Sequence, residues 1–202
     1  MSTLIDLLSG HIQDPLFMEW IKQSRPATIQ ELWTTCPRGS WLLQIVGSCH
    51  YGQDEIERKV LVQVAFECAS LSLTTHQDTP AAREMTDALK AYCRVQSLAP
   101  WDQNRPKLLD ESNDALQSAK RKLGTGPWLS VIEAVEEAAN AASTAAMQPQ
   151  GRLIGFTTAH WCWRASDRTE SIGVGMAAQT AEIVRVRIQF DSLRSLSSDG
   201  GK

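Results

Sequence analysis

The sequence predicts an all-α protein, a single domain of about eight helices. Helix-capping signals recur along the chain. Thr28 and Glu31 match a capping box. Asp54 precedes a long segment with apolar residues at helical spacing, and Thr79 precedes a proline suited to a first helical turn. Strand-like alternation is scarce, and we interpret its clearest case, 184–188, as a helix end. We find no internal repeat of fixed period, so an orthogonal bundle and a short helical array are both open.

Start and stop signals give the order of the expected helices. Their ranges are 14–21, 28–35, 41–49, 54–73, 79–92, 108–123, 128–147, 153–165 and 171–189. The helix at 54–73 should bury one stripe, made of Ile56, Val60, Val64, Cys68 and Leu71. Asp167 and Glu170 should cap the last helix.

The stretch 32–43 reads as a corner between two helices, with a tryptophan on each side. Pro37 should end the first helix near Thr35, because proline lacks an amide hydrogen and clashes with the preceding turn. Gly39 gives the chain freedom at the corner, and Ser40 can cap the helix that begins at Trp41. We therefore interpret the corner as a structural joint.

The domain organisation follows from the same pattern. Residues 1–26 form an apolar helical extension, residues 27–190 the helical domain, and residues 191–202 a disordered tail of small polar residues. A loop near 98–107, which contains Pro100 and Pro106, should separate two halves of the domain.

Composition argues against nucleic-acid and membrane partners. The chain has 202 residues, a net charge of −3 and 43% hydrophobic residues, so it offers no strong basic field. The triplet Lys120–Lys122 is better explained as a solvated helix end. No run approaches the roughly 20 apolar residues of a membrane span, and the N-terminus lacks the basic region of a signal peptide. We expect a cytoplasmic protein.

The cysteines are the strongest candidates for a metal-binding or catalytic site, but the arguments for either are weak. Five scattered cysteines without a CxxC pair do not form a disulfide framework. The best zinc set would combine Cys49 and His50 with Cys36, Cys68 and His76, but adjacent ligands rarely bind one ion. A nucleophilic pair of Cys162 with His160, or Cys93 with a distant histidine, is conceivable. Residues two apart on a helix face different sides, however.

The remaining polar and aromatic clusters have structural explanations. Two groups of carboxylates, one of Glu133, Glu136 and Glu137 and one of Asp54, Glu55 and Glu57, are typical of solvated helix faces; the functional alternative is an acidic patch that steers a basic partner.

Of Trp161 and Trp163, one should lie in the core and the other could be a second core contact or a binding anchor. No phosphate-binding, dinucleotide, nucleophile-elbow or zinc-protease motif occurs. We predict no catalytic, cofactor-binding or metal-binding residues.

Several short signatures together resemble a known family. They are Thr28–Trp33, the corner Cys36–Leu43, the segment Arg58–Leu61, the alanine-rich region near 138–146 and the closing Gln179–Arg185. In these the chain resembles a family of helical bacterial immunity proteins that accompany polymorphic toxin systems. The resemblance covers roughly 28–190 and implies an all-α fold and a role in binding a cognate toxin. It carries no motif of binding residues, so the partner-binding surface is unknown.

These observations lead to one expected function and two alternatives. We expect a non-enzymatic helical domain that binds another protein, with a cognate toxin as the partner that the resemblance implies, and occludes its active site. The first alternative is a scaffold or regulatory module that docks through its N-terminal segment, where Leu4, Leu7, Leu8, Ile12, Phe17 and Trp20 are apolar. The second is an unrecognised enzyme with a deep polar pocket. The oligomeric state is open.

Overall fold

A computed structural model describes residues 8, 12, 14–75, 78–98, 102–123, 126, 128–146 and 152–193, and it confirms the all-α fold. The helices in these residues are α2 (Pro15–Ser24), α3 (Ile29–Thr35), α4 (Gly39–Ser48), α5 (Glu55–Thr74), α6 (Pro80–Ser97), α7 (Arg105–Leu123), α8 (Leu129–Ala146), α9 (Arg152–Glu170) and α10 (Met176–Arg187), followed by the short 3-10 helix η1 (Phe190–Ser192). The described part of the chain has no strand.

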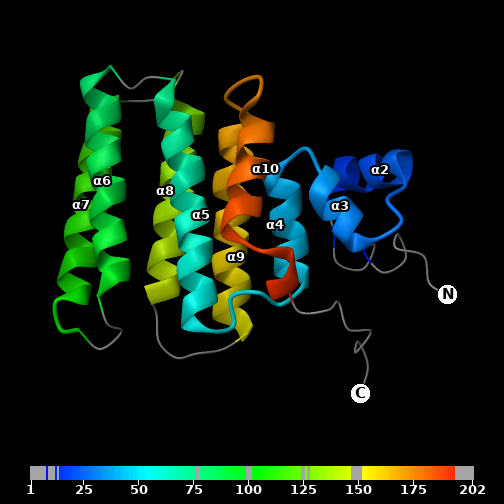
Figure 1. The fold of residues 1–202 in the computed structure, drawn as a ribbon. Coiled ribbons are helices and arrows are strands. Elements are labelled where there is room, and N and C mark those ends of the chain that lie inside the picture. The colour runs from blue at the N-terminus through cyan, green and yellow to red at the C-terminus, as the bar shows by residue number, and fades with distance from the viewer. Residues whose placement is uncertain are drawn as a thin grey trace.

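The helices pack as a bundle. Figure 1 shows α4 to α10 running roughly along one direction, with α2 lying across them at one end. The α9 helix packs against α8 and α5 and also against α4, from which it is distant in the sequence; α10 packs on α4 and α5. In a solenoid each unit would contact only its neighbours along the chain. Here the C-terminal helices fold back over α4 and α5, so the arrangement is a bundle.

The predicted helix starts are confirmed by their capping contacts. The side chains of Asp14, Thr28, Asp54 and Thr79 each accept a backbone N–H from the first turn of α2, α3, α5 and α6. The capping box differs in one respect, because the carboxylate of Glu31 accepts the amide of Ala27, 2.7 Å away, and not that of Thr28. These starts are local features, which is why the sequence reveals them.

Three predicted caps near the corner are wrong. Ser40 lies inside α4, which begins at Gly39 with Arg38 at the N-cap position. Asp167 and Glu170 belong to the end of α9, which continues five residues beyond its expected end at 165. The α10 helix begins only at Met176. All three side chains are used in contacts between distant segments, so reasoning from local capping assigned them to the wrong helix ends.

The predicted stripe of α5 is also wrong in part. Val64 and Cys68 are buried as expected, but Ile56 is 76% exposed, and Val60 and Leu71 are half-buried. From its second turn onward, α5 instead has buried residues on several of its sides. They include Leu61, Val62, Ala65, Phe66, Ala69 and Ser72. The reason is that α5 is central: α6, α8, α9 and α10 all pack against it.

The C-terminal end and the central loop differ from expectation, whereas the N-terminal extension is helical over Pro15–Ser24, as predicted. In the N-terminal extension, Leu8, Ile12, Phe17 and Ile21 are buried in the main core, while Leu4 and Leu7 lie outside the described residues. The loop near 98–107 is shorter than predicted, because α7 begins at Arg105. Asp191 and Ser192 belong to η1, so the first residues of the predicted tail are ordered; residues 194–202 lie outside the described part of the chain.

None of the helices in the described residues combines the length and apolar character needed to cross a bilayer.

The start of α9 is pressed against the turn that follows α4. A Cβ placed on Gly155 would lie 2.4 Å from the carbonyl oxygen of Gly52, and Gly52 itself has a φ of 96°. The contacting atoms are backbone, so no side chain can move away to make room. Glycine is therefore required at both positions, at one for space and at the other for the left-handed backbone.

We expect Gly155→Ala to destabilise the protein by about 2 kcal/mol or more, because the overpacking at the turn outweighs the better helix propensity of alanine. Gly173→Ala is the matched control, since a Cβ there meets nothing within 4 Å; its effect should stay within about 0.5 kcal/mol. Urea unfolding followed by circular dichroism measures both. Equal stability of the two variants would contradict the close approach.

Candidate functional site

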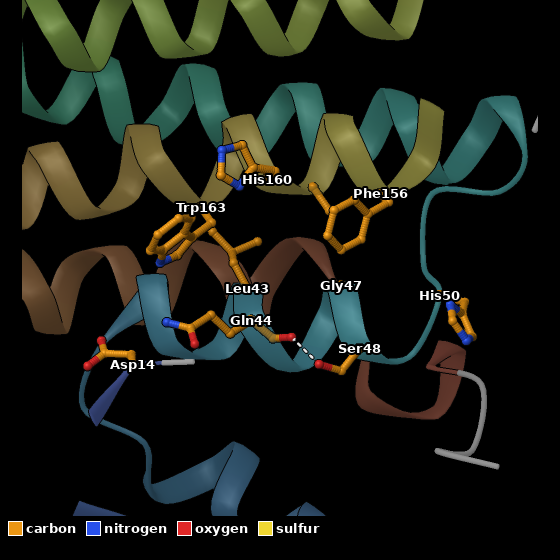
Figure 2. A pocket seen from close by; sticks show the side chains of 10 residues that line it. Asp14, Leu43, Gln44, Gly47, Ser48, His50, Phe156, His160 and Trp163 are labelled. Carbon is orange, nitrogen blue, oxygen red and sulfur yellow. Dashed lines mark hydrogen bonds between the residues drawn. The ribbon is translucent and has the colours of Figure 1, made fainter. Parts of the chain in front are cut away.

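An open cleft of about 520 Å³ lies along the seam between α4 and α9. Its lining residues are Asp14, Leu43, Gln44, Gly47, Ser48, His50, Phe156, Ala159, His160 and Trp163. Figure 2 shows Phe156 and Trp163 reaching from α9 toward α4, with Asp14 at one end of the cleft and His50 at the other. The two helices meet through small residues, since a Cβ on Gly47 would lie 3.9 Å from that of Ala159. This volume is within the range of ligand-binding pockets.

A buried carboxylate holds α4 against α9 and α10. The side chain of Glu170 is 1% exposed. It accepts hydrogen bonds from the amide and hydroxyl of Ser40 at 2.8 and 2.7 Å, from Arg38 Nε at 2.6 Å, from Thr180 Oγ1 at 2.7 Å and from Ser166 Oγ at 3.2 Å. The negative charge lies at the N-terminus of α4, where the helix dipole and free amides favour it. We call Glu170 and these four partners the Glu170 anchor.

Two further contacts from α10 complete the joint at the corner. The amide of Gly39 donates to Thr180 Oγ1 at 3.2 Å, and a Cβ on Gly39 would lie 2.6 Å from the Thr180 backbone. The guanidinium of Arg185 donates to the carbonyl oxygens of Trp33, at 3.0 Å, and of Cys36. These bonds satisfy carbonyls at the end of α3, which have no partner within the helix. The predicted corner is therefore a joint, held by residues about 150 positions away.

The Asp14 end of the cleft is fixed by aromatic packing. One carboxylate oxygen of Asp14 caps α2, and the other accepts the indole N–H of Trp41 at 2.9 Å. The ring of Phe17 stacks on Trp41 with centroids 4.9 Å apart and planes 9° apart. On the same indole, the guanidinium of Arg38 lies 5.1 Å from the ring centroid. The described part of the N-terminal extension is thus built into the cleft wall.

The mouth of the cleft is aromatic. Phe156 is 63% exposed, and the ring of His160 lies 5.3 Å from that of Trp161 and 5.4 Å from that of Trp163. Both tryptophans are half-buried and pack against the core, and Trp163 lines the cleft. Burial lowers the pKa of His160 and the charge of Arg164 lowers it further, while the charge of Glu137 raises it; the net lowering favours the neutral imidazole.

Polar groups at the other rim are held by the end of α4. The hydroxyl of Ser48 donates to the carbonyl of Gln44 at 2.8 Å, while the side-chain nitrogen of Gln44 is buried and without a hydrogen-bond partner. His50 has a φ of 55°, and its amide and that of Tyr51 bond back to α4, as in a Schellman motif. Glycine is the favoured residue at such a position, so histidine here is a local strain beside the cleft.

The candidate cysteine sites are not assembled. Cys36, Cys49, Cys68 and Cys162 are buried, and burial raises the pKa of Cys36 and Cys68 to about 12 and of Cys49 to about 11. Cys162 is fully buried whereas His160 lines the cleft, so the two do not form a pair. No group of three potential metal ligands occurs among the described residues, and His76 lies outside them.

The charged clusters are used within the protein. The first carboxylate group pairs with cations on neighbouring helices: Glu133 with Arg168, Glu136 with Lys120 and Glu137 with Arg164. In the second, Asp54 and Glu57 accept backbone amides at the start of α5, and Glu55 pairs with Lys59. The basic triplet Lys120–Lys122 lies in the last turn of α7, as predicted. Neither carboxylate group forms an unpaired acidic patch.

The sequence predicts possible roles for Asp14, His50, His160 and Trp163, though for other reasons, and none for Gln44 or Phe156. For Phe156 a signal existed. The buried face of α9 includes Gly155, Ala159, Cys162, Ser166 and Thr169, and a phenylalanine one position out of that register lies about 100° around the helix, at the edge of the buried face. Gln44 carries no such signal, because a glutamine on a helix is ordinarily solvated.

Comparison with known proteins identifies no relative: no family model, curated protein or solved structure matches the chain.

We expect Glu170→Ala to destabilise the protein by about 3 to 5 kcal/mol, because it leaves the Arg38 guanidinium and several buried donors without their acceptor. Glu182→Ala, an exposed position on α10, removes the same charge and should change stability by less than about 0.5 kcal/mol. Thermal and urea unfolding measure the difference. If Glu170→Ala unfolds at the same urea concentration as Glu182→Ala, the anchor does not hold the corner.

Alkylation of the folded protein with iodoacetamide near pH 8 should modify Cys93 alone, because the other four thiols are buried. Even Cys93 should react more slowly than a free thiol, since partial burial of its thiol and the charge of Glu67 raise its pKa. Mass spectrometry after proteolysis locates the adducts, and labelling in urea, where all five cysteines react, is the control. Rapid labelling of Cys36 or Cys162 would contradict the packing described above.

Proposed function

We propose that this chain is a non-enzymatic domain that binds another protein in the α4–α9 cleft. The observation that supports this most is the exposure of Phe156 at the cleft mouth, next to Trp163 and His160. A single exposed aromatic residue is ordinary on a protein surface, but an aromatic group above a preformed cavity is typical of interface centres. Both helices that flank the cleft are packed in the core, so binding should cost little conformational entropy.

The arrangement of the polar groups favours binding over catalysis. The Ser48 hydroxyl in the cleft donates to a backbone carbonyl and has no base hydrogen-bonded to it in the described residues. The described thiols lie away from the cleft lining, and the carboxylate of Asp14 already accepts three N–H groups. Nucleophilic catalysis needs a nucleophile within hydrogen-bonding reach of a base. This geometry supports the non-enzymatic proposal.

The position of the N-terminal segment favours the cleft over the alternative docking element. Leu8, Ile12 and Phe17 are buried in the main core, and Trp20 is half-buried against it. These side chains contact the protein itself, so the described part of the segment has little apolar surface to offer a partner. The segment instead helps to form the cleft through Asp14.

The resemblance to immunity proteins makes a toxin the first partner to test. A domain of this kind would act in the cytoplasm by occlusion, covering the active site of the toxin with the α4–α9 face. The natural candidates are the products of genes adjacent to the one that encodes this chain. Suppression of a neighbour's toxicity on co-expression, together with a purified complex, would support both the partner class and the role.

We expect Phe156→Glu to abolish capture of such a partner, because it removes the aromatic ring from the interface centre and puts there a charge that binding must desolvate. Val186→Glu is the matched control: Val186 is 64% exposed, close to the 63% of Phe156, but lies on α10 outside the cleft. Both variants should keep the wild-type melting temperature, since each position is exposed. Pull-down and titration calorimetry with the adjacent gene product measure binding. Equal loss of binding in both variants, or in neither, would place the interface elsewhere.

A further inference from the structure

We propose that the α4–α9 cleft selects a partner segment carrying a cationic side chain, arginine or lysine, which seats against Trp163 at the Asp14 end. This inference rests on the proposed function, because it names the chemistry of the segment that the cleft receives. It follows from the charged groups around that end of the cleft, where negative charges outnumber positive ones.

Carboxylates predominate at this end. Asp14 lines the cleft beside Trp163 in Figure 2. Asp167 lies one turn beyond Trp163 on α9, and residues four apart share one helix face. Its side chain is 44% exposed. Burial raises the pKa of Asp167 and the charge of Arg38 lowers it. The charges of Glu170 and Asp14 raise it and that of Arg168 lowers it, so all four charged groups lie within electrostatic reach of Asp167.

The cations nearby do not neutralise this charge. Arg38 faces both acids of α9, at 2.6 Å from Glu170 and 3.4 Å from Asp167, and thus supplies one positive charge against three negative ones. The charges of Arg168 and Arg164 also act near the cleft, on Asp167 and His160. Each is paired with a carboxylate of α8, Arg168 with Glu133 at 3.1 Å and Arg164 with Glu137 at 2.7 Å, so counting each pair adds no net charge. The lining residues include no lysine or arginine. The end of the cleft therefore has an excess of negative charge.

An aromatic ring beside excess negative charge is a favourable site for an organic cation. The face of an indole attracts an ammonium or guanidinium group, most strongly where water is excluded. A long basic side chain also places its methylene groups on apolar surface, and Leu43 and Phe156 supply such surface in the cleft. An anionic side chain would be repelled at the same place. Arginine or lysine satisfies both the aromatic and the acidic lining.

The test needs no knowledge of the partner. The probes are N-acetyl-argininamide and N-acetyl-citrullinamide, which have nearly the same shape and differ in charge. Binding is followed by the indole N–H resonance of Trp163 in a heteronuclear NMR spectrum, assigned with Trp163→Phe. We expect the arginine probe to bind in the millimolar range, with an affinity about three- to tenfold higher than that of the citrulline probe. High salt should reduce this difference.

Variants test the acidic end directly. Asp167→Asn should weaken the arginine probe about threefold and leave the citrulline probe unchanged, because it removes a charge and keeps the shape. Glu182→Gln, which removes a charge on α10 away from the cleft, should leave both affinities at wild-type values. Equal binding of the two probes, or an unchanged arginine affinity in Asp167→Asn, would overturn the inference. Neither result needs a protein partner, so the proposed function can fail or hold separately.

Discussion

The structure depends on one buried carboxylate, that of Glu170. Removing a charged group from water is costly, and only several hydrogen bonds to the charged form offset that cost. Here five donor groups, from α4, α9, α10 and the N-cap residue of α4, meet at one side chain. The interaction fixes the direction in which α4 leaves the corner. The cleft between α4 and α9 has its shape because that direction is fixed.

The cleft illustrates how one seam between helices can serve two purposes. Gly47 and Ala159 are small, so the two helices approach closely and stabilise the fold. Larger side chains on either side of that contact, among them Leu43 and Trp163, leave a hollow above it. Because the walls belong to helices packed in the core, the hollow is preformed. Such preorganisation reduces the entropy lost when a partner binds.

The sequence allowed the fold class and most helix starts to be predicted, because these depend on neighbouring residues. Asp14, Thr28 and Asp54 cap the helices that follow them directly. It did not allow the roles of Ser40 and Glu170 to be predicted, since 130 positions separate them and each resembles an ordinary cap. The aromatic residues of the cleft were visible only in part, because whether a half-buried side chain faces a hollow or a neighbour depends on tertiary packing.

The separation between the corner and the residues that hold it has a consequence for synthesis of the chain. The corner at Arg38 leaves the ribosome early, while Glu170 and Thr180 follow 132 and 142 positions later. At translation rates of roughly 5 to 20 residues per second, this interval lasts on the order of ten seconds. During that time the apolar surfaces of α3 and α4 lack their final neighbours. Nascent chains of this protein are therefore candidates for chaperone binding until α10 has emerged.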